Sequence, residues 1–255
     1  MNPLYLRTLR LLFGPLFLSR SITVLFDSLP AAPRPTLHAW PDALSLAWHG
    51  PLRTTDSRSR GDLLTFLLSP ANLGGVRGKL LLSGKGQFPL ARRLHEGGAP
   101  LGDVFAFVSG LYFRGKLTYA TTFVGAVADR VRIITSNRGL VAPDTMVTAA
   151  DLAAFGACDL DPADPRYAEP LRRDLASLAD GPVVLLGSLA TGKYLEILVA
   201  VLGERLVAPA SFVGLGDMSR GSLLLQAARA GRELAYCPAA PLWNGRPSLR
   251  RRRPA

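Results

Sequence analysis

Short runs of apolar residues alternate with longer segments of helical periodicity along most of the chain. The apolar runs predict strands at residues 44–48, 79–82, 104–108, 131–135, 183–186, 206–208 and 234–237. The intervening segments predict helices at residues 62–68, 89–95, 149–155, 166–178 and 223–230, and two more that end near residues 127 and 202. Strands that are apolar throughout and alternate with helices are typical of a parallel sheet covered on both faces. The sequence therefore predicts an α/β fold, namely a single, mostly parallel sheet with helices on both faces in a Rossmann-like, three-layer arrangement.

The two ends of the chain depart from this alternation. Residues 1–35 read as an N-terminal extension and linker, residues 36–240 as the α/β domain, and residues 241–255 as a basic, disordered tail. The apolar run at residues 11–18 is broken by glycine and proline and is too short to cross a bilayer, so no integral membrane segment is expected. Three explanations of the N-terminal segment stay open: an extension, a targeting signal and a misassigned start codon. We expect a cytoplasmic protein, with the targeting signal as the open alternative.

The net charge of +11 is concentrated at the two ends. Residues 1–20 carry +3, the segment from Arg246 onward carries +5, and the remaining body carries only +3. A nearly balanced body is a weaker indication of nucleic-acid binding than the isoelectric point of about 10.4 suggests. Two cysteines and three scattered histidines argue against a disulfide framework and against the usual cysteine-rich or histidine-rich metal sites.

Five loops that follow predicted strands share glycine, hydroxyl and basic side chains. They lie at residues 83–86, 109–116, 135–139, 187–193 and 214–221. In a parallel sheet such loops gather at the carboxyl edge, where ligands bind, and each following helix directs its positive end to the same edge. The loops therefore predict a cationic crevice for an anionic ligand. The alternative is that the glycines only mark turns and that the arginines are solvated.

We expect this crevice to bind the phosphate of a nucleotide-like or nucleic-acid ligand. The ligand-binding candidates are the basic, hydroxyl, amide, acidic and aromatic residues of these loops: Lys85, Ser109, Tyr112, Arg114, Lys116, Asn137, Arg138, Lys193, Asp217 and Arg220. Lysines and arginines would hold phosphate, Asn137 or Asp217 would contact a ribose or a base, and Tyr112 would stack on a base. The expected partner is a phosphorylated small molecule or a nucleic acid.

The chain has 26 arginines but only four lysines, and each lysine directly follows a glycine. The pairs lie at residues 78–79, 84–85, 115–116 and 192–193. A compact ammonium beside accessible backbone N–H groups suits phosphate binding. The alternative is a coincidence of small numbers.

The segment Gly187–Lys193 matches the pattern G-x-x-x-x-G-K between a predicted strand and a predicted helix. Tyr194 stands where Ser or Thr would hold Mg²⁺, and the loop comes late in the chain. A P-loop-like NTPase is therefore an alternative function. A non-catalytic interaction protein is another.

Catalytic machinery is not evident in the sequence. There is no G-x-S-x-G motif, and Ser83, Ser109 and Ser188 have no evident histidine partner. Paired carboxylates for acid–base catalysis are not visible. The sequence assigns no catalytic residue, cofactor, metal or oligomeric state, and whether the protein is an enzyme stays open.

Four segments carry a resemblance to known proteins: SGLYFRGKLTYA at 109–120, ITSNRGLVAPD at 134–144, GSLATGKY at 187–194 and GDMSRG at 216–221. They resemble an uncharacterised family of bacterial α/β proteins, and their layout is similar to the YaaA-like group, which stands near the uracil-DNA glycosylase fold. The resemblance covers residues 104–237 and implies a Rossmann-like sheet with a nucleotide or nucleic-acid ligand. The glycosylases' Gly-Gln-Asp-Pro-Tyr segment and His-Pro-Ser loop are absent from the sequence, so base excision is not implied.

Overall fold

The computed structural model describes residues 64–243, apart from residues 126 and 191. The predicted N-terminal extension, the predicted strand at residues 44–48 and most of the basic tail lie outside the described residues.

A six-stranded sheet lies at the centre, with the strand order β4-β3-β1-β6-β7-β8. The strands are β1 (Thr65–Leu68), β3 (Val131–Ile134), β4 (Leu140–Val141), β6 (Val183–Leu186), β7 (Leu206–Pro209) and β8 (Tyr236–Pro238). The four central strands are parallel, whereas β4 and β8 pair antiparallel at the two edges. The predicted α/β class with a mostly parallel sheet is confirmed.

The central strands are mostly apolar because both of their faces are covered, although β3 carries the half-buried Arg132. Every residue of β1, β6 and β7 is buried. In the sheet, Phe66 of β1 lies beside Val131 of β3 and Val184 of β6. This arrangement accounts for short runs such as VVLL, which carry no polar position.

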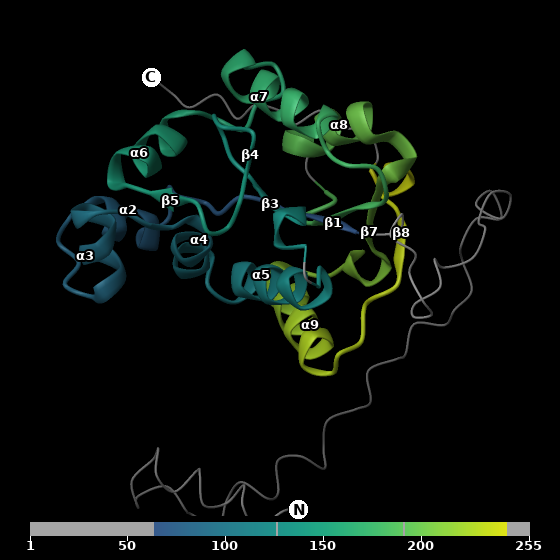
Figure 1. The fold of residues 1–255 in the computed structure, drawn as a ribbon, viewed down its shortest axis with the longest axis horizontal. Coiled ribbons are helices and arrows are strands. Elements are labelled where there is room, and N and C mark those ends of the chain that lie inside the picture. The colour runs from purple at the N-terminus through teal and green to yellow at the C-terminus, as the bar shows by residue number, and fades with distance from the viewer. Residues whose placement is uncertain (1–63, 126, 191, 244–255) are drawn as a thin grey trace, which may run out of the picture. The chain divides into compact units, whose positions relative to one another are not determined.

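Helices lie on both sides of the sheet, as Figure 1 shows. The helices α5 (Leu111–Phe123) and α9 (Asp217–Arg229) lie on one side, and α7 (Pro165–Ala176) and α8 (Gly192–Leu202) lie on the other. The connections from β1 to β3 and from β6 to β7 cross the sheet in opposite directions. Right-handed crossovers therefore place α5 and α8 on opposite faces. Within the described residues, no helix has both the length and the apolar character that a membrane span needs.

Two glycines let α5 and α9 approach each other closely, and this is the most extensive contact between described helices. A Cβ atom on Gly115 would lie 2.7 Å from the carbonyl oxygen of Gly221, and one on Gly221 would lie 2.9 Å from Cα of Tyr112. Both distances are too short for a real Cβ, so the two backbones meet where only glycine fits. This contact fixes the start of α9 beside the start of α5.

The segment between β1 and α5 adds three helices before the chain returns to the sheet. Its elements are α2 (Val76–Leu82), α3 (Pro89–Glu96), α4 (Leu101–Ser109) and the two-residue strand β2 (Ala99–Pro100). β2 pairs antiparallel with β5 (Met146–Val147), and α6 (Ala149–Ala157) follows β5. A capping box formed by Thr148 and Asp151 starts α6.

Three predictions in this part of the chain are wrong. Residues 79–82 and 104–108 are not strands but parts of α2 and α4, and the predicted helix at 62–68 instead contains β1. Short apolar runs carry no periodicity that separates a buried strand from a buried helix, so tertiary packing decided each case. The strands predicted at 131–135, 183–186 and 206–208 are confirmed. The strand predicted at 234–237 forms two residues later as β8, and α9 begins six residues before its predicted start.

Candidate ligand-binding site

The strands β1 and β6 lie side by side at the point where the strand order reverses. From β1 the chain continues to β3 on one side, and from β6 it continues to β7 on the other. In open parallel sheets, ligands bind beyond the carboxyl ends of two such strands. The residues directly after them here are Ser69 and Gly187, and the backbone N–H of Ser69 donates to the carbonyl of Leu186 at 3.1 Å.

Four helices place an early residue near these strand ends. Tyr112 is the second residue of α5, Tyr167 and Tyr194 are the third residues of α7 and α8, and Arg220 is the fourth residue of α9. Tyr194 interacts electrostatically with Tyr112, Tyr167 and Arg220, and Tyr112 interacts with Arg220. The amino ends of helices carry a partial positive charge, so this edge of the sheet favours an anion.

Lys116 lies one turn further along α5 and directs its ammonium group to the end of β1. Its Nζ donates to the carbonyl oxygen of Ser69 at 2.6 Å and to Oγ of Ser69 at 2.9 Å. Nζ also lies 4.7 Å from the ring centre of Tyr112 and 4.6 Å from that of Phe113. The residue is only 1% exposed. A hydrogen-bonded position between two rings therefore holds the amine rigidly.

Burial changes the protonation of Lys116. Removal from water lowers its pKa from 10.5 to about 7, although the negative charge of Asp217 opposes this shift. At neutral pH the amine is therefore divided between the charged and neutral forms. A bound anion would favour the charged form and raise the pKa again.

Two of the tyrosine hydroxyls have no hydrogen-bond acceptor. Within the described residues, the buried hydroxyls of Tyr112 and Tyr167 donate to no acceptor, although Arg220 acts as a donor toward Tyr112. The hydroxyl of Tyr194 instead donates to the carbonyl of Ser188 at 2.9 Å. Burial raises the pKa of Tyr112 to about 12, against the effect of the positive charge of Arg220. The hydroxyls therefore stay protonated at neutral pH. A buried donor without an acceptor indicates a position that a ligand can satisfy.

Arg220 supplies the second buried cation. It is 8% exposed, and its Nε and Nη2 donate to the carbonyl oxygen of Phe212 at 3.3 Å and 3.2 Å. Its Nη1 lies 3.4 Å from Oδ1 of Asp217, whose side chain is 68% exposed. The guanidinium also acts on the hydroxyl of Tyr112, both through its charge and through a side-chain hydrogen bond.

Gly187 leaves space where the two strand ends meet. A Cβ atom at this position would lie 2.9 Å from Cβ of Ser69, 2.9 Å from the hydroxyl of Tyr194 and 3.2 Å from Oγ of Ser69. Any larger residue would press on both hydroxyl groups. Glycine at the end of β6 therefore keeps the hydroxyls of Ser69 and Tyr194 near each other.

The structure brings together four of the predicted site residues: Tyr112, Lys116, Asp217 and Arg220. The ring of Tyr112 is buried beside Lys116, and its expected stacking on a base stays a prediction.

The other predicted residues lie in different surroundings. Lys85, Arg114 and Lys193 are exposed, and Ser109 ends α4. Arg138 pairs with Asp151 and lies over the ring of Phe155.

The prediction that all five loops follow strands is wrong for two of them. The loop at residues 83–86 follows α2, and the loop at 109–116 joins α4 to α5. The premise that placed Lys85 beside the other cations therefore fails. Asn137, after β3, has a buried Oδ1 without a hydrogen-bond partner in the described residues, and its contact with a ribose stays a prediction.

The four Gly-Lys pairs do not share one environment. Lys116 is buried, whereas Lys79, Lys85 and Lys193 are exposed. Gly115 serves the contact with α9, and Gly84 has a φ of +67° that favours glycine. Helix packing and turn geometry therefore explain these two glycines without a phosphate.

Sequence reasoning missed Ser69, Tyr167 and Tyr194 as site residues. Because the sequence pattern predicts a helix at residues 62–68, it does not place Ser69 at the end of a strand. The available signal was the run TFLL, which is as short and as free of charge as the correctly predicted strand VVLL. Placing TFLL as a strand puts a serine at its carboxyl end.

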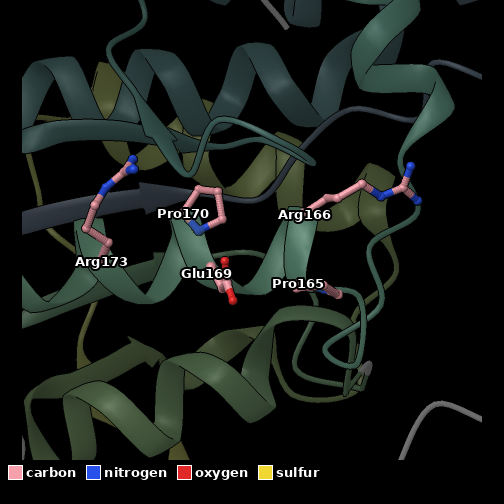
Figure 2. A pocket seen from close by; sticks show the side chains of 5 residues that line it. All are labelled: Pro165, Arg166, Glu169, Pro170 and Arg173. Atoms are coloured by element: carbon pink, nitrogen blue, oxygen red, sulfur yellow. The ribbon is translucent and has the colours of Figure 1, made fainter.

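A surface groove of about 500 Å³ lies along α7, and its lining residues flank Tyr167 in the sequence. Figure 2 shows its lining residues Pro165, Arg166, Glu169, Pro170 and Arg173. Both of its arginines are engaged, because Arg166 pairs with Asp164 and Arg173 pairs with Asp174. The groove therefore offers less free charge than the strand ends.

Within residues 64–243, no group of three or more His, Cys, Asp or Glu residues is arranged to hold a metal ion. Comparison with protein-family models, curated proteins and solved structures gives no match for this chain, so the resemblance to the YaaA-like group stays a prediction.

Proposed function

We propose that the protein binds a phosphorylated, nucleotide-like small molecule at the carboxyl ends of β1 and β6. One observation carries the proposal: two buried cations, Lys116 and Arg220, interact with Tyr112, whose buried hydroxyl has no acceptor among the described residues, at the point where the strand order reverses. A phosphate accepts hydrogen bonds from all three kinds of donor.

The charge balance supports an anion. Lys116 and Arg220 face one carboxylate, that of Asp217, which is mostly exposed and screened by water. The amino ends of the surrounding helices add further positive potential. Such a site gains most from a ligand with one or two negative charges.

The burial of the two cations favours a small molecule over a nucleic acid. Lys116 is 1% exposed and Arg220 is 8% exposed, whereas nucleic-acid contacts to phosphate are made mainly by exposed cations on a surface. The P-loop-like alternative stays a prediction. The hydroxyl of Tyr194, which replaces the Mg²⁺ ligand, is directed back to Ser188 within the same loop.

Isothermal titration with inorganic phosphate, AMP and ATP tests the proposal, and an oligonucleotide without terminal phosphate tests the nucleic-acid alternative. Arg220→Gln should weaken binding roughly 10- to 100-fold, which corresponds to the loss of about 1.5–3 kcal/mol for a hydrogen bond to a charged group. Arg229→Gln is the matched control, since Arg229 is exposed in the last turn of the same helix. Thermal unfolding of both variants separates loss of binding from loss of fold. Equal affinity in the two variants, or no binding by the native chain, would overturn the proposal.

Binding should also take up protons. An anion raises the pKa of Lys116 from about 7, so the bound state holds up to one more proton than the free state near pH 8. Titration in two buffers with different ionisation enthalpies measures this uptake.

A further inference from the structure

Ser69 and Lys116 form a hydroxyl–amine pair at the proposed binding site. Nζ of Lys116 lies 2.9 Å from Oγ of Ser69, and a second hydrogen bond of 2.6 Å to the carbonyl of the same residue fixes the amine in place. The rings of Tyr112 and Phe113 flank the amine. A serine hydroxyl held next to a buried lysine is the arrangement of an activated nucleophile with its base.

We propose that Ser69 is a nucleophile activated by Lys116, and that the site hydrolyses an ester whose acyl or alcohol part carries a phosphate. The proposal rests on the proposed function, because it assigns a reaction to the same anionic ligand. The phosphate would lie toward Arg220, and the ester carbonyl would lie at Oγ of Ser69.

In the unliganded chain, burial leaves part of the amine neutral at physiological pH, so it can act as the base. A phosphate bound with the substrate reduces this neutral fraction, so hydrolysis of a phosphorylated ester needs a higher pH than hydrolysis of an uncharged ester. Burial lowers the pKa of Lys116 to about 7. Asp217 of α9 acts on it through its charge, and the ring of Tyr112 of α5 lies against it. Arg220 of α9 and Tyr194 of α8 interact in turn with Tyr112. Only Asp217 among them carries a negative charge at neutral pH, and it is mostly exposed.

The reaction balances with water as the second reactant. Oγ of Ser69 attacks the ester carbonyl carbon, and its proton moves to Nζ of Lys116. The bond from carbon to the leaving oxygen then breaks, and the proton on Nζ passes to that oxygen, which leaves as an alcohol. Water next attacks the acyl-serine and gives its proton to Nζ. The carboxylic acid departs, and Ser69 regains its proton from Lys116.

Tyr112, whose ring lies against Nζ of Lys116, would stabilise the negative oxygen that forms in each attack. Its buried hydroxyl has no acceptor within the described residues, so its proton is free to be donated. Its pKa of about 12 keeps the hydroxyl protonated across the working range of the lysine. Preorganised donors of this kind supply a large part of the catalysis of acyl transfer.

A serine-directed fluorophosphonate and p-nitrophenyl acetate test the pair directly, because neither reagent carries the phosphate. Reaction of the fluorophosphonate forms a bond from Oγ to phosphorus and expels fluoride, so the full-length chain gains a mass that peptide mapping locates. We expect the label on Ser69, and a hydrolysis rate that rises with pH around a midpoint near 7. Ser69→Ala should abolish both signals. Lys116→Arg should lower both at least 100-fold, because a guanidinium keeps the charge but accepts no proton.

Ser219→Ala is the matched control, since Ser219 is exposed near the start of α9 and labels only if the reagent attacks any accessible serine. Label on Ser69 that survives in Ser219→Ala supports the proposal. An unlabelled Ser69 in the native chain from pH 6 to pH 10 overturns it. Phosphate binding by the Ser69→Ala variant distinguishes the two levels. If phosphate binds but Ser69 is inert, only the proposed reaction is wrong. If Ser69 is labelled but phosphate does not slow the labelling, the proposed ligand is wrong.

Discussion

Replacing Lys116 by Met should make the protein more stable at pH 7. Burial lowers the pKa of Lys116 from 10.5 to about 7, and each pKa unit corresponds to about 1.4 kcal/mol. Holding this side chain in the folded state therefore costs about 5 kcal/mol at pH 7, where the unfolded chain binds the proton. The methionine side chain is unbranched and apolar and suits the space between the rings of Tyr112 and Phe113. Loss of the two hydrogen bonds to Ser69 offsets about 1–3 kcal/mol, which leaves a net gain of about 2–4 kcal/mol.

The lowered pKa of Lys116 also predicts how the unfolding free energy changes with pH. Between the folded pKa near 7 and the unfolded value of 10.5, the unfolded state binds more protons, so stability rises with pH. The slope for the native chain should approach about 1.4 kcal/mol per pH unit between pH 7 and 8.5. Burial raises the pKa values of Cys158 and Cys237, whose opposing effect grows only toward pH 9. The slope should vanish in Lys116→Met.

Urea unfolding followed by circular dichroism at pH 6, 7, 8 and 8.5 measures both effects. Below pH 7 the native curve should be flat, because both states then hold the proton. A native stability that stays constant from pH 7 to 8.5, or a Lys116→Met variant less stable than the native chain at pH 7, would show that Ser69 stabilises the ammonium more than burial destabilises it.

Two further predictions concern packing and buried hydroxyls. Gly221→Ala should lower the unfolding free energy by about 1–3 kcal/mol because its Cβ would meet the backbone of Tyr112 at 2.9 Å. Gly156→Ala in α6 should raise the unfolding free energy by up to about 1 kcal/mol, because a Cβ there meets nothing within 4 Å. Urea unfolding of both variants checks the contrast. Tyr167→Phe should raise the melting temperature because it removes a buried hydroxyl without a partner. Tyr194→Phe should lower the melting temperature because the hydroxyl of Tyr194 donates to Ser188. Equal shifts of the two variants in a thermal melt would contradict this difference in hydrogen bonding.

The fold class was predictable from the sequence because the central strands are short and almost wholly apolar, with Thr65 of β1 and Arg132 of β3 as their polar positions. A run such as VVLL can lie only in a sheet covered on both faces or in a buried helix, and the regular alternation with longer helices decides between them. The same reasoning fails for residues 104–108. Leu101, Val104 and Phe105 are buried at helical spacing in α4, but the continuous apolar run conceals this periodicity.

The candidate site was only partly predictable, because it depends on which strands are neighbours. Tyr112, Lys116 and Arg220 were found from the composition of loops. Their meeting with Ser69 depends on the pairing of β1 with β6 and on the contact of Gly115 with Gly221. Neither contact leaves a local signal, since the residues involved are more than 100 positions apart in the chain.

The pairing of β1 with β6 has a consequence for the order of folding during synthesis. Thr65 pairs with Val183, so 118 positions separate the two halves of the ligand-binding edge. At about 5–20 residues per second, β1 waits roughly 10 s on the ribosome for its neighbour. In that interval its apolar faces lack their final cover, and closing so long a loop also slows refolding of the whole chain. Nascent chains that stop before residue 183 therefore carry Ser69 and Lys116 but not the edge on which these two residues act.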